Sequence, residues 1–334
     1  MHIAVLGAGS WGTALALVLA RNGHDTRLWG HDPEKIEQLR IHGCNQRYLP
    51  GISFPQSLSV TADLAEATTG SSLVVIAVPS HAFRSTLENL RPFLKADHKV
   101  AWATKGLELK TGLPLHHLVK TILGERIDAA VLSGPTFAGE VAREVPTAIT
   151  VASENEAFAN ELVGFFHNSR FRAYTTTDII GVELGGAVKN VLAIAAGIAD
   201  GLGYGANARA ALITRGLAEL MRLGVTLGGK PETLMGLSGV GDLILTCTDN
   251  QSRNRRFGLG LGQGRTAESV TTEIGQEIEG IPTARILHML SLRHQIDMPI
   301  TEQVYRILYE DLPPHEAVGN LLVRDPKPEA ENPT

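Results

Sequence analysis

The sequence predicts an α/β domain with a doubly wound, mostly parallel sheet, followed by an all-α domain. A glycine-rich turn lies between an apolar strand and an apolar helix at residues 3–16. Short β-rich runs then alternate with helical patterns, and strand-like runs disappear after residue 179. We therefore expect domains over 1–180 and 181–323. Residues 324–334, rich in proline and charge, are expected to form a flexible tail.

The glycine-rich turn has the spacing of a dinucleotide site of the Rossmann type. Gly7 permits a tight turn, Gly9 lets a pyrophosphate approach the backbone, and Gly12 lets the following helix pack close to the strand. The helix is expected to stop at residues 22–23, and residues 26–29 are expected to form the second strand. Together they complete a βαβ unit that would bind a nucleotide cofactor.

The end of the second strand lacks the acidic residue that usually binds the adenosine ribose. Gly30 stands at that position and His31 follows it. A ribose 2′-phosphate would meet no repulsion there, and His31, or more weakly Lys35, could contact it. We therefore favour NADP(H), with NAD(H) accepted. Two alternatives stay open, because Asp32 would reach the ribose if the strand ended slightly later, and His31 could be an ordinary solvated histidine.

Later segments extend the sheet and then build the helical domain. Residues 185–197 are apolar almost all round, which predicts a buried helix. Further strands are expected at 73–78, 99–104, 129–132, 147–152 and 171–174. This alternation of strands and helices is typical of a sheet that is covered on both faces.

Composition excludes several classes of protein. The chain has 334 residues, 43% hydrophobic and 19% charged, which is ordinary for a globular protein of two domains. Its net charge of −5 gives no general attraction for nucleic acid or anionic membranes, so the basic cluster 253–256 needs a local explanation. Cys44 and Cys247 are far apart, which predicts neither disulfides nor a metal site and fits a reducing compartment.

The N-terminus and the apolar runs lead to a cytoplasmic expectation. The first strand is expected to begin at residue 2, with no leader of the signal-peptide type before it. The longest apolar run, residues 191–199, is too short to span a bilayer. We expect a cytoplasmic protein without an integral membrane segment.

Ligands of open α/β sheets bind beyond the carboxyl ends of the strands, so we searched those positions for chemistry. Residues 78–80 could line the approach of a nicotinamide, although a structural turn is the simpler reading. Lys105 follows the next strand and is either a site residue or a solvated lysine. Residues 133–138 follow the strand after it and offer a hydroxyl group and backbone N–H groups.

Lys189 lies inside the most apolar predicted helix, where a lysine is costly unless its ammonium has partners or loses its charge. Burial and a neighbouring cation both lower a lysine pKa, which makes such a lysine a proton donor and acceptor near neutral pH. Asp242 lies in a glycine-rich turn and could complete the pocket. Residues 250–258 offer groups that suit a phosphate, or form a solvated basic loop.

Six motifs, in this order, resemble the bacterial NAD(P)-dependent sn-glycerol-3-phosphate dehydrogenases over nearly the whole chain. They are GAGSWGTA at 7–14, WATKGLE at 102–108, SGPTFA at 133–138, GGAVKN at 185–190, GVGDL at 239–243 and NQSRNRRFG at 250–258. The resemblance implies reversible reduction of dihydroxyacetone phosphate to sn-glycerol 3-phosphate, which feeds glycerophospholipid synthesis. It also implies a cytoplasmic enzyme, commonly a homodimer, whose helical domain is like that of 6-phosphogluconate dehydrogenase.

The resemblance assigns roles to particular residues. Lys189 would donate a proton to the ketone oxygen and accept it in reverse, supported by Lys105 and Asp242. Glu277 is acidic where the family pattern has an apolar residue, which a backbone contact would tolerate. With the three motif glycines, Gly7, Gly9 and Gly12, the cofactor positions are Ser10, Trp11, His31, Lys105, Ala138, Arg253, Glu277 and Glu279. The substrate positions are Lys105, Gly134, Thr136, Lys189, Asp242, Ser252, Arg253 and Asn254.

Two other functions stay open. A related dehydrogenase of the same architecture that acts on a hydroxy acid would need to bind a carboxylate instead of a phosphate. A non-catalytic NADP(H) sensor could dispense with Lys189 or Asp242, and this chain has both.

Overall fold

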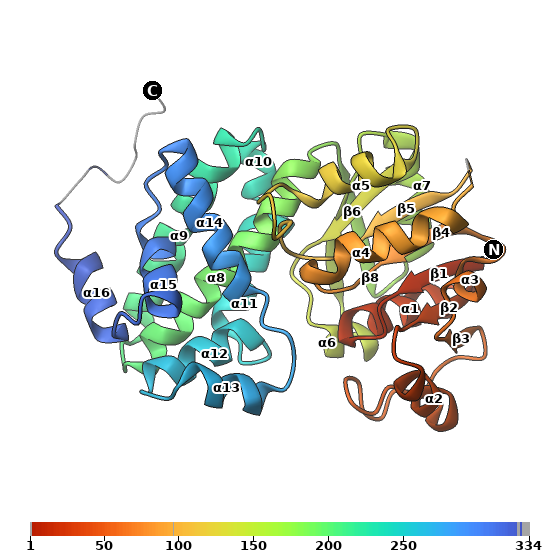
Figure 1. Cartoon of the computed structure of the whole chain (residues 1–334), viewed down its shortest axis with the longest axis horizontal. Coiled ribbons are helices and arrows are strands. Elements are labelled where there is room, and N and C mark those ends of the chain that lie inside the picture. Colours follow the sequence, from red (N-terminus) through yellow and green to blue (C-terminus); the bar gives the residue numbers. More distant parts are fainter. Residues whose placement is uncertain (1, 96, 326–327, 329–334) are drawn as a thin grey trace.

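The structure, a computed structural model, describes residues 2–95, 97–325 and 328. An α/β domain and a helical domain lie side by side, with the helical domain on the left of Figure 1. The α/β domain is built on one eight-stranded sheet of order β3-β2-β1-β4-β5-β6-β7-β8. The strands are β1 His2–Leu6, β2 Asp25–Trp29, β3 Leu58–Thr61, β4 Ser71–Ile76, β5 Lys99–Trp102, β6 Asp128–Ser133, β7 Thr147–Ala152 and β8 Phe171–Thr176.

Neighbouring strands are parallel throughout, except that β7 runs antiparallel to β6. The prediction of a doubly wound, mostly parallel sheet is therefore confirmed. Side chains of β1 alternate between two apolar cores, with Ile3 and Val5 on one face of the sheet and Ala4 and Leu6 on the other. All four are fully buried, as expected for a strand that is covered on both faces.

Helices cover both faces of the sheet. The core containing Ile3 is completed by α1 Ser10–Arg21, α2 Pro33–His42, α6 Ala138–Ala142 and α7 Glu156–Phe166. The core containing Ala4 is completed by α3 Leu64–Thr68, α4 Ser80–Leu90 and α5 Leu115–Leu123. A short 3₁₀ helix at Arg91–Phe93 follows α4.

The second domain is helical, as predicted. Its elements are α8 Ile179–Gly201, α9 Ala206–Thr226, α10 Pro231–Leu234, a π-helical turn Leu237–Gly241, α11 Asp242–Thr248, α12 Arg253–Gly262, α13 Ala267–Ile274, α14 Gly280–His294, α15 Pro299–Tyr309 and α16 Pro314–Leu322. The core surrounds α8, which is long and apolar enough to cross a membrane by length and composition alone. However, 94% of that apolar window is buried inside the protein, as in the core helix of a folded domain.

Helices α8 and α12 pack with their backbones in contact. A Cβ on Gly258 would lie 2.0 Å from the carbonyl oxygen of Ile194, and a Cβ on Gly197 would lie 2.1 Å from that of Arg255. Neither position can accept a side chain without separating the helices. This contact fixes the start of α12 relative to the middle of α8.

The structure differs from the predicted elements in a few places. Strand β3 was not predicted, because four residues at the sheet edge are too short to show a clear alternation. Helix α8 begins six residues before the predicted helix, where the side chain of Asp178 caps it by accepting from the Gly181 N–H at 2.9 Å. Most of the expected tail lies outside the described residues.

Candidate active site

The glycine-rich turn between β1 and α1 forms an open cradle. Gly7 has φ +119°, and a Cβ on it would lie 2.6 Å from the carbonyl oxygen of Ala77. A Cβ on Gly12 would lie 1.9 Å from the Gly7 carbonyl oxygen, so both positions require glycine. A Cβ on Gly9 would meet no atom within 4 Å. Because the positive end of α1 starts at this open space, the cradle fits the pyrophosphate of a dinucleotide.

Ser10 and Trp11 are the first two residues of α1, where backbone N–H groups have no partner within the helix. The indole Nε1 of Trp11 is also buried without a hydrogen-bond partner among the described residues. Buried donors are nearly always paired in a folded protein. An orphaned donor next to the cradle is a second feature that suits a bound ligand.

The residues considered for binding the ribose, which follow β2, differ in their exposure and contacts. Gly30 is buried, and a Cβ on it would lie 2.8 Å from Cδ1 of Ile36, whereas His31 is exposed. Asp32 caps α2 by accepting from the Lys35 N–H at 3.2 Å, and its carboxylate lies 2.7 Å from Lys35 Nζ. The hydrogen bond from Lys35 lowers the pKa of Asp32. Asp32 and Lys35 thus contact each other, directly after the exposed His31.

Two lysines and one aspartate from three segments meet beyond the carboxyl end of β5. Lys105 follows β5, Lys189 lies in α8, and Asp242 begins α11. Asp242 is 0% exposed. Its Oδ1 accepts from Lys189 Nζ, and its Oδ2 accepts from Lys105 Nζ at 2.7 Å. One buried carboxylate therefore holds both ammonium groups.

Lys189 is poised between its charged and neutral forms. Burial lowers its pKa to about 7, because removal from water disfavours the ammonium. The Asp242 carboxylate opposes this shift, and the positive charge of Lys105 adds to it. A lysine with this pKa can both donate and accept a proton near neutral pH.

The segment after β6 completes the same corner of the site. Lys105 Nζ donates to the carbonyl oxygen of Gly134 at 2.9 Å and to Thr136 Oγ1 at 3.4 Å. Ser133 Oγ is buried and has no hydrogen-bond partner among the described residues. The predicted substrate residues Lys105, Gly134 and Thr136 are therefore in direct contact.

The start of α12 holds the other predicted substrate residues. Ser252 is the N-cap, and its hydroxyl accepts from a backbone N–H in the first turn. The Asn254 side chain donates to Asn190 Oδ1 at 2.9 Å and accepts from the Gly280 N–H at 2.9 Å. Both side chains are therefore engaged in holding the helix. A ligand at the amino-terminal end of α12 would contact Arg253 and the first backbone N–H groups of the helix.

The three arginines of the basic cluster have different surroundings. Arg255 is buried and forms an ion pair with Asp200. Arg256 is exposed. Arg253 is partly buried; burial lowers its pKa, and the Glu279 carboxylate opposes that shift. The cluster thus divides into one buried and ion-paired arginine, one solvated arginine and one partly buried arginine beside Glu279.

Glu277 and Glu279 reach from the helical domain to the α/β domain. The Glu279 carboxylate accepts from the Ser80 backbone N–H at 2.9 Å and from Ser80 Oγ at 2.5 Å. Burial raises the pKa of Glu279. Glu277 Oε1 lies 3.7 Å from His81 Nδ1. Both contacts lie at the start of α4, next to the segment predicted to line the nicotinamide.

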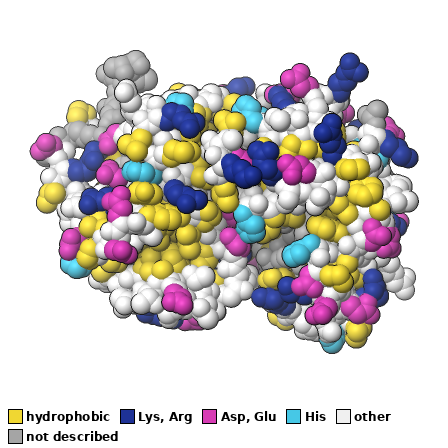
Figure 2. All heavy atoms as spheres, in the orientation of Figure 1, with side chains coloured by type: hydrophobic (Ala, Val, Ile, Leu, Met, Phe, Trp, Pro, Cys, Tyr) yellow, Lys and Arg dark blue, Asp and Glu magenta, His cyan; other side chains and the backbone are white. Residues whose placement is uncertain are grey.

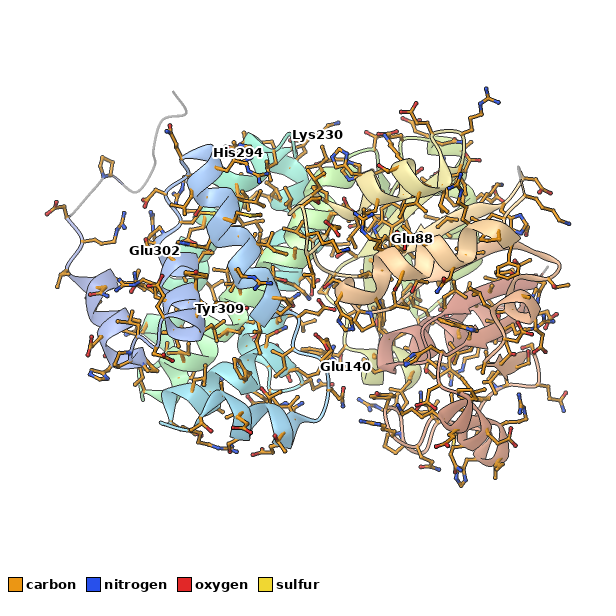
Figure 3. All side chains as sticks on the ribbon, in the orientation of Figure 1. Glu88, Glu140, Lys230, His294, Glu302 and Tyr309 are labelled. Atoms are coloured by element: carbon orange, nitrogen blue, oxygen red, sulfur yellow. The ribbon has the colours of Figure 1, made fainter. Side chains whose placement is uncertain are left out.

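A notch separates the two domains along one side of the molecule (Figure 2). Glu140 of α6 lies at this junction in Figure 3 and accepts from Gln251 Nε2 at 2.8 Å. Ala138, a predicted cofactor residue, is the first residue of the same short helix. Both domains therefore contribute residues around this notch, which we call the cleft.

Comparisons with known proteins match both halves of the chain. Residues 2–159 match the family model of the NAD-dependent glycerol-3-phosphate dehydrogenase N-terminus, and residues 178–319 match that of the C-terminus. The chain belongs to the NAD-dependent glycerol-3-phosphate dehydrogenase family. It is therefore an oxidoreductase that uses a nicotinamide cofactor.

Relatives of this dehydrogenase family match over nearly their whole length. A glycerol-3-phosphate dehydrogenase [NAD(P)+] of Methylococcus capsulatus is 63% identical over 98% of both chains. The crystal structure of a glycerol-3-phosphate dehydrogenase from Coxiella burnetii is 52% identical, with a TM-score of 0.94 over 97% of this chain and 99% of that one. D-mandelate dehydrogenase, 16% identical over 97% of this chain and 100% of that one, has a TM-score of 0.64 and shares the fold alone.

Sequence reasoning missed some residues at the dehydrogenase site. Thr246 lies one helical turn after Asp242 and accepts from Lys189 Nζ at 3.0 Å. Its spacing from Asp242 on the same helix could have identified it. Asn190 follows Lys189 and donates to the backbone oxygen of Gly186 at 3.3 Å. Its side chain also accepts from Asn254 at the start of α12, and no local pattern predicts a contact between segments so far apart in the sequence.

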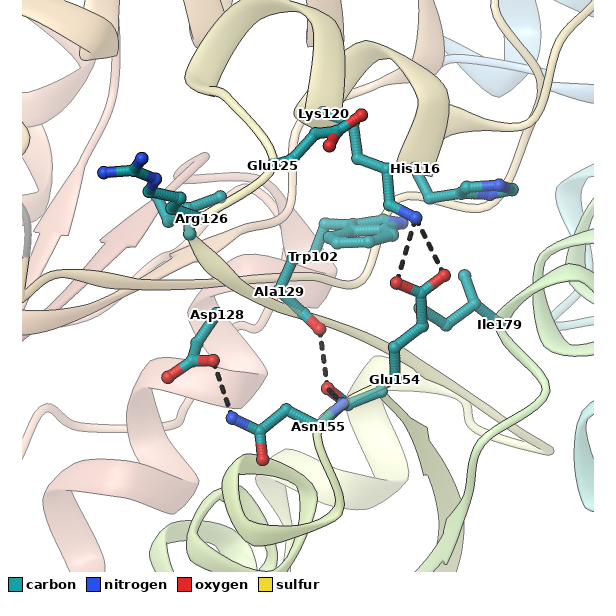
Figure 4. Close-up of a pocket in the computed structure, with 12 residues that line it drawn as sticks. Trp102, His116, Lys120, Glu125, Arg126, Asp128, Ala129, Glu154, Asn155 and Ile179 are labelled. Atoms are coloured by element: carbon teal, nitrogen blue, oxygen red, sulfur yellow. Dashed lines mark hydrogen bonds and ion pairs between the residues drawn. The ribbon is translucent and has the colours of Figure 1, made fainter.

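A separate cavity of about 230 Å³ lies beside the amino-terminal end of β6 (Figure 4). An ion pair between Lys120 and Glu154 lies at its wall, with Nζ to oxygen distances of 2.8 and 2.9 Å. None of the predicted site residues lines this cavity. Among the described residues, no group of three or more His, Cys, Asp or Glu side chains is placed to hold a metal ion.

Proposed function

We propose that this dehydrogenase reversibly reduces dihydroxyacetone phosphate to sn-glycerol 3-phosphate for glycerophospholipid synthesis, with Lys189 as the general acid and base. The observation that carries the proposal is the pair of lysines, one buried and one partly buried, on one fully buried carboxylate. Lys189 and Lys105 share Asp242, and Lys189 lies in α8, which packs directly against α12. A ketone placed there would have a proton donor on one side and a phosphate-binding helix end on the other.

The chemistry divides between the cofactor and the chain. When bound, the nicotinamide cofactor supplies the hydride that reduces the ketone. Lys189 Nζ donates its proton to the ketone oxygen, on which negative charge develops, and recovers that proton in the reverse direction. Asp242 orients the Lys189 ammonium. Lys105 contributes a second positive charge and is itself held by Gly134 and Thr136.

The start of α12 supports a phosphate over a carboxylate. Arg253 offers a planar set of donors, and the first backbone N–H groups of α12 point out of the helix end. The likeness to D-mandelate dehydrogenase concerns the fold alone and does not favour a hydroxy acid.

The remaining assignments belong to the same proposal. Residues 1–180 would bind the cofactor, with NADP(H) favoured over NAD(H), and 181–323 would supply Lys189, Asp242 and the phosphate site. The cofactor would contact the three turn glycines and the other positions that match the family pattern. The enzyme would act in the cytoplasm as a homodimer, as the resemblance to the bacterial enzymes implies.

A direct assay tests the proposed reaction. The purified chain would be mixed with dihydroxyacetone phosphate and NADPH or NADH, and the loss of reduced cofactor would be followed by absorbance. We expect turnover with both cofactors and a higher kcat/KM with NADPH. Pyruvate and other 2-keto acids serve as competing substrates. Faster turnover of a keto acid would favour the hydroxy-acid function, and cofactor binding without any turnover would favour a sensor.

Arg253→Ala should raise the KM for dihydroxyacetone phosphate by about 10- to 100-fold, the range for losing hydrogen bonds to a charged group. The KM for phosphate-free dihydroxyacetone should change far less. Initial rates at saturating cofactor would measure both constants, since Arg253 also falls at a family cofactor position. Arg256→Ala is the matched control, because Arg256 is in the same helix turn and exposed. Equal losses with both ketones would contradict a phosphate contact.

His31→Asp should lower the affinity for NADPH by roughly 3- to 10-fold relative to NADH, because a carboxylate would repel the ribose 2′-phosphate. His31 is exposed, so the change removes no packing. Gly30 is a poorer position for this test, because any side chain there would collide with Ile36. Fluorescence titration with both cofactors would measure the ratio, with His31→Asn as the neutral control. An unchanged ratio would place the ribose elsewhere.

A further inference from the structure

We infer that Glu183 is a positioning residue that holds the helix carrying Lys189 in register with the strand leading to Lys105. This inference rests on the proposed role of Lys189. Glu183 lies in the first turns of α8, and its side chain is only 1% exposed. A carboxylate buried to this degree is costly unless its oxygens are hydrogen-bonded.

Within the described part of the chain, the hydrogen-bond partners of the Glu183 side chain belong to the other domain. Its Oε1 accepts from Trp102 Nε1 at 3.0 Å and from the His116 backbone N–H at 3.0 Å. Its Oε2 lies 2.5 Å from His116 Nδ1. Trp102 is the last residue of β5, and His116 is the second residue of α5. One carboxylate from the helical domain thus ties two elements of the α/β domain to α8.

The contact lies close to both lysines along the chain. Lys105 is three residues beyond Trp102, and Lys189 is six residues beyond Glu183. Six residues of α-helix span about 9 Å. The Glu183 contact therefore fixes the relative position of the two segments a short distance before each segment reaches Asp242.

Between Glu183 and Lys189, helix α8 contacts the segments that carry Asp242 and Lys105. A Cβ on Gly185 would lie 2.2 Å from the carbonyl oxygen of Ser238, in the turn that leads to Asp242. A Cβ on Gly186 would lie 3.0 Å from Ser133 Oγ and 3.5 Å from Lys105 Cγ. A shift of α8 along these surfaces would change the distances among Lys189, Asp242 and Lys105 together.

The other contacts between α8 and the α/β domain are longer or less directional. Most neighbours of α8 are apolar, and apolar contacts are non-directional. Asn190 Nδ2 also donates to the Lys105 carbonyl oxygen, but at 3.5 Å, compared with 3.0 Å for the bonds to Glu183 Oε1. Hydrogen bonds to Glu183 have preferred distances and angles. Since a misplacement of about 1 Å can lower a rate by about 10²-fold, a directional contact at this point has a measurable effect on catalysis.

The experiment compares Glu183→Ala with Glu183→Gln. Alanine removes every contact, and we expect kcat to fall by about 10- to 100-fold. The Kd for NADPH should stay within roughly 3-fold, because the cradle at β1 and α1 is untouched. The pH at which kcat changes should also move, because the pKa of Lys189 depends on its distances from Asp242 and Lys105. Glutamine should retain most of kcat, because its Oε1 can accept from both Trp102 and His116.

Glu219→Ala is the matched control. Glu219 is also a buried carboxylate of the helical domain, and it accepts from the Ile300 N–H at 2.5 Å and from the Thr301 N–H at 3.1 Å. Its loss should lower Tm and leave the pH dependence of kcat unchanged. If Glu183→Ala lowers Tm but behaves like Glu219→Ala in kcat and pH dependence, the inference is overturned.

Trp102→Phe keeps the test decisive if Glu183→Ala does not fold. It removes the Nε1 donor together with part of a fully buried ring, so Tm should fall, and a smaller change of kcat and of its pH dependence than in Glu183→Ala is expected. Wild-type values in a folded Trp102→Phe would contradict the inference. Failure of the Lys189 proposal is a separate result, because Lys189→Ala would then turn over normally. If Lys189→Ala is inactive and the Glu183 variants are normal, only the positioning role fails.

Discussion

Lys189→Ala should lower turnover by roughly 10²- to 10⁴-fold, the usual contribution of a general acid and base, and should leave NADPH binding nearly intact. The fold should tolerate the change, because Asp242 keeps its contact with Lys105 at 2.7 Å. Stopped-flow or steady-state rates would give kcat, and a cofactor titration would give Kd. Lys189→Met is the matched control for volume, since it fills the same space without an amine. Near-normal turnover in either variant would remove Lys189 from the mechanism.

The pKa of about 7 gives this prediction a second, independent signature. Ketone reduction needs the ammonium form of Lys189, so kcat/KM for reduction, which reports the free enzyme, should fall as the pH rises through about 7. Alcohol oxidation needs the neutral amine, so kcat/KM for oxidation should fall as the pH drops through the same value. In Lys189→Met, the opposite pH dependences of ketone reduction and alcohol oxidation should disappear. Parallel slopes would show that a different group controls the rate.

Asp242→Asn should damage both stability and catalysis. The buried Lys189 ammonium and the partly buried Lys105 ammonium would lose their shared counterion, and breaking a buried pair such as Lys189 and Asp242 costs about 3–5 kcal/mol of unfolding free energy. The pKa of Lys189 should fall further, because the Asp242 carboxylate raises it. Turnover at neutral pH should drop by about 10²-fold or more, because the ammonium is both depleted and misoriented. Denaturant unfolding and kcat would measure the two effects.

Asp200→Asn is the control for this variant. Asp200 lies near the other end of α8 and also holds two cations, with Arg209 Nη1 at 3.0 Å and Arg255 as its second partner. Its loss should lower the unfolding free energy and leave the pH dependence of kcat in place. If Asp242→Asn affected only stability, Asp242 would be a structural residue instead of the orienting partner of Lys189.

Much of the fold follows from local patterns. The glycine turn requires Gly7 and Gly12 for reasons that the spacing alone conveys, and β7 lies at the residues predicted for it. The antiparallel direction of β7 was not predicted, because strand direction depends on the path of the connecting chain. The short edge strand β3 was missed, because four residues carry too little periodicity.

The site was predictable only in part. Lys189 was identifiable because a lysine in an all-round apolar helix is costly without a partner. Asp242 was predicted to lie in the same pocket, and in the structure its Oδ1 accepts from Lys189 Nζ. The N-cap role of Ser252 was predictable, because a serine just before a helix is a usual start signal, but it was predicted only as a substrate residue. The role of Glu183 could not be predicted, because its donors Trp102 and His116 lie in distant segments of the chain.

The backbone contact between α8 and α12 has a consequence for substrate size. Lys189 and Arg253 lie on two helices that touch at Gly197 and Gly258, where no side chain separates them. Opening or closing of the cleft would therefore move both groups as one rigid unit. With Lys189 at the carbonyl oxygen and Arg253 at the phosphate, the fixed distance between the two residues would limit the length of the substrate. A substrate analogue with one more carbon between ketone and phosphate would contact one of the two residues and not the other.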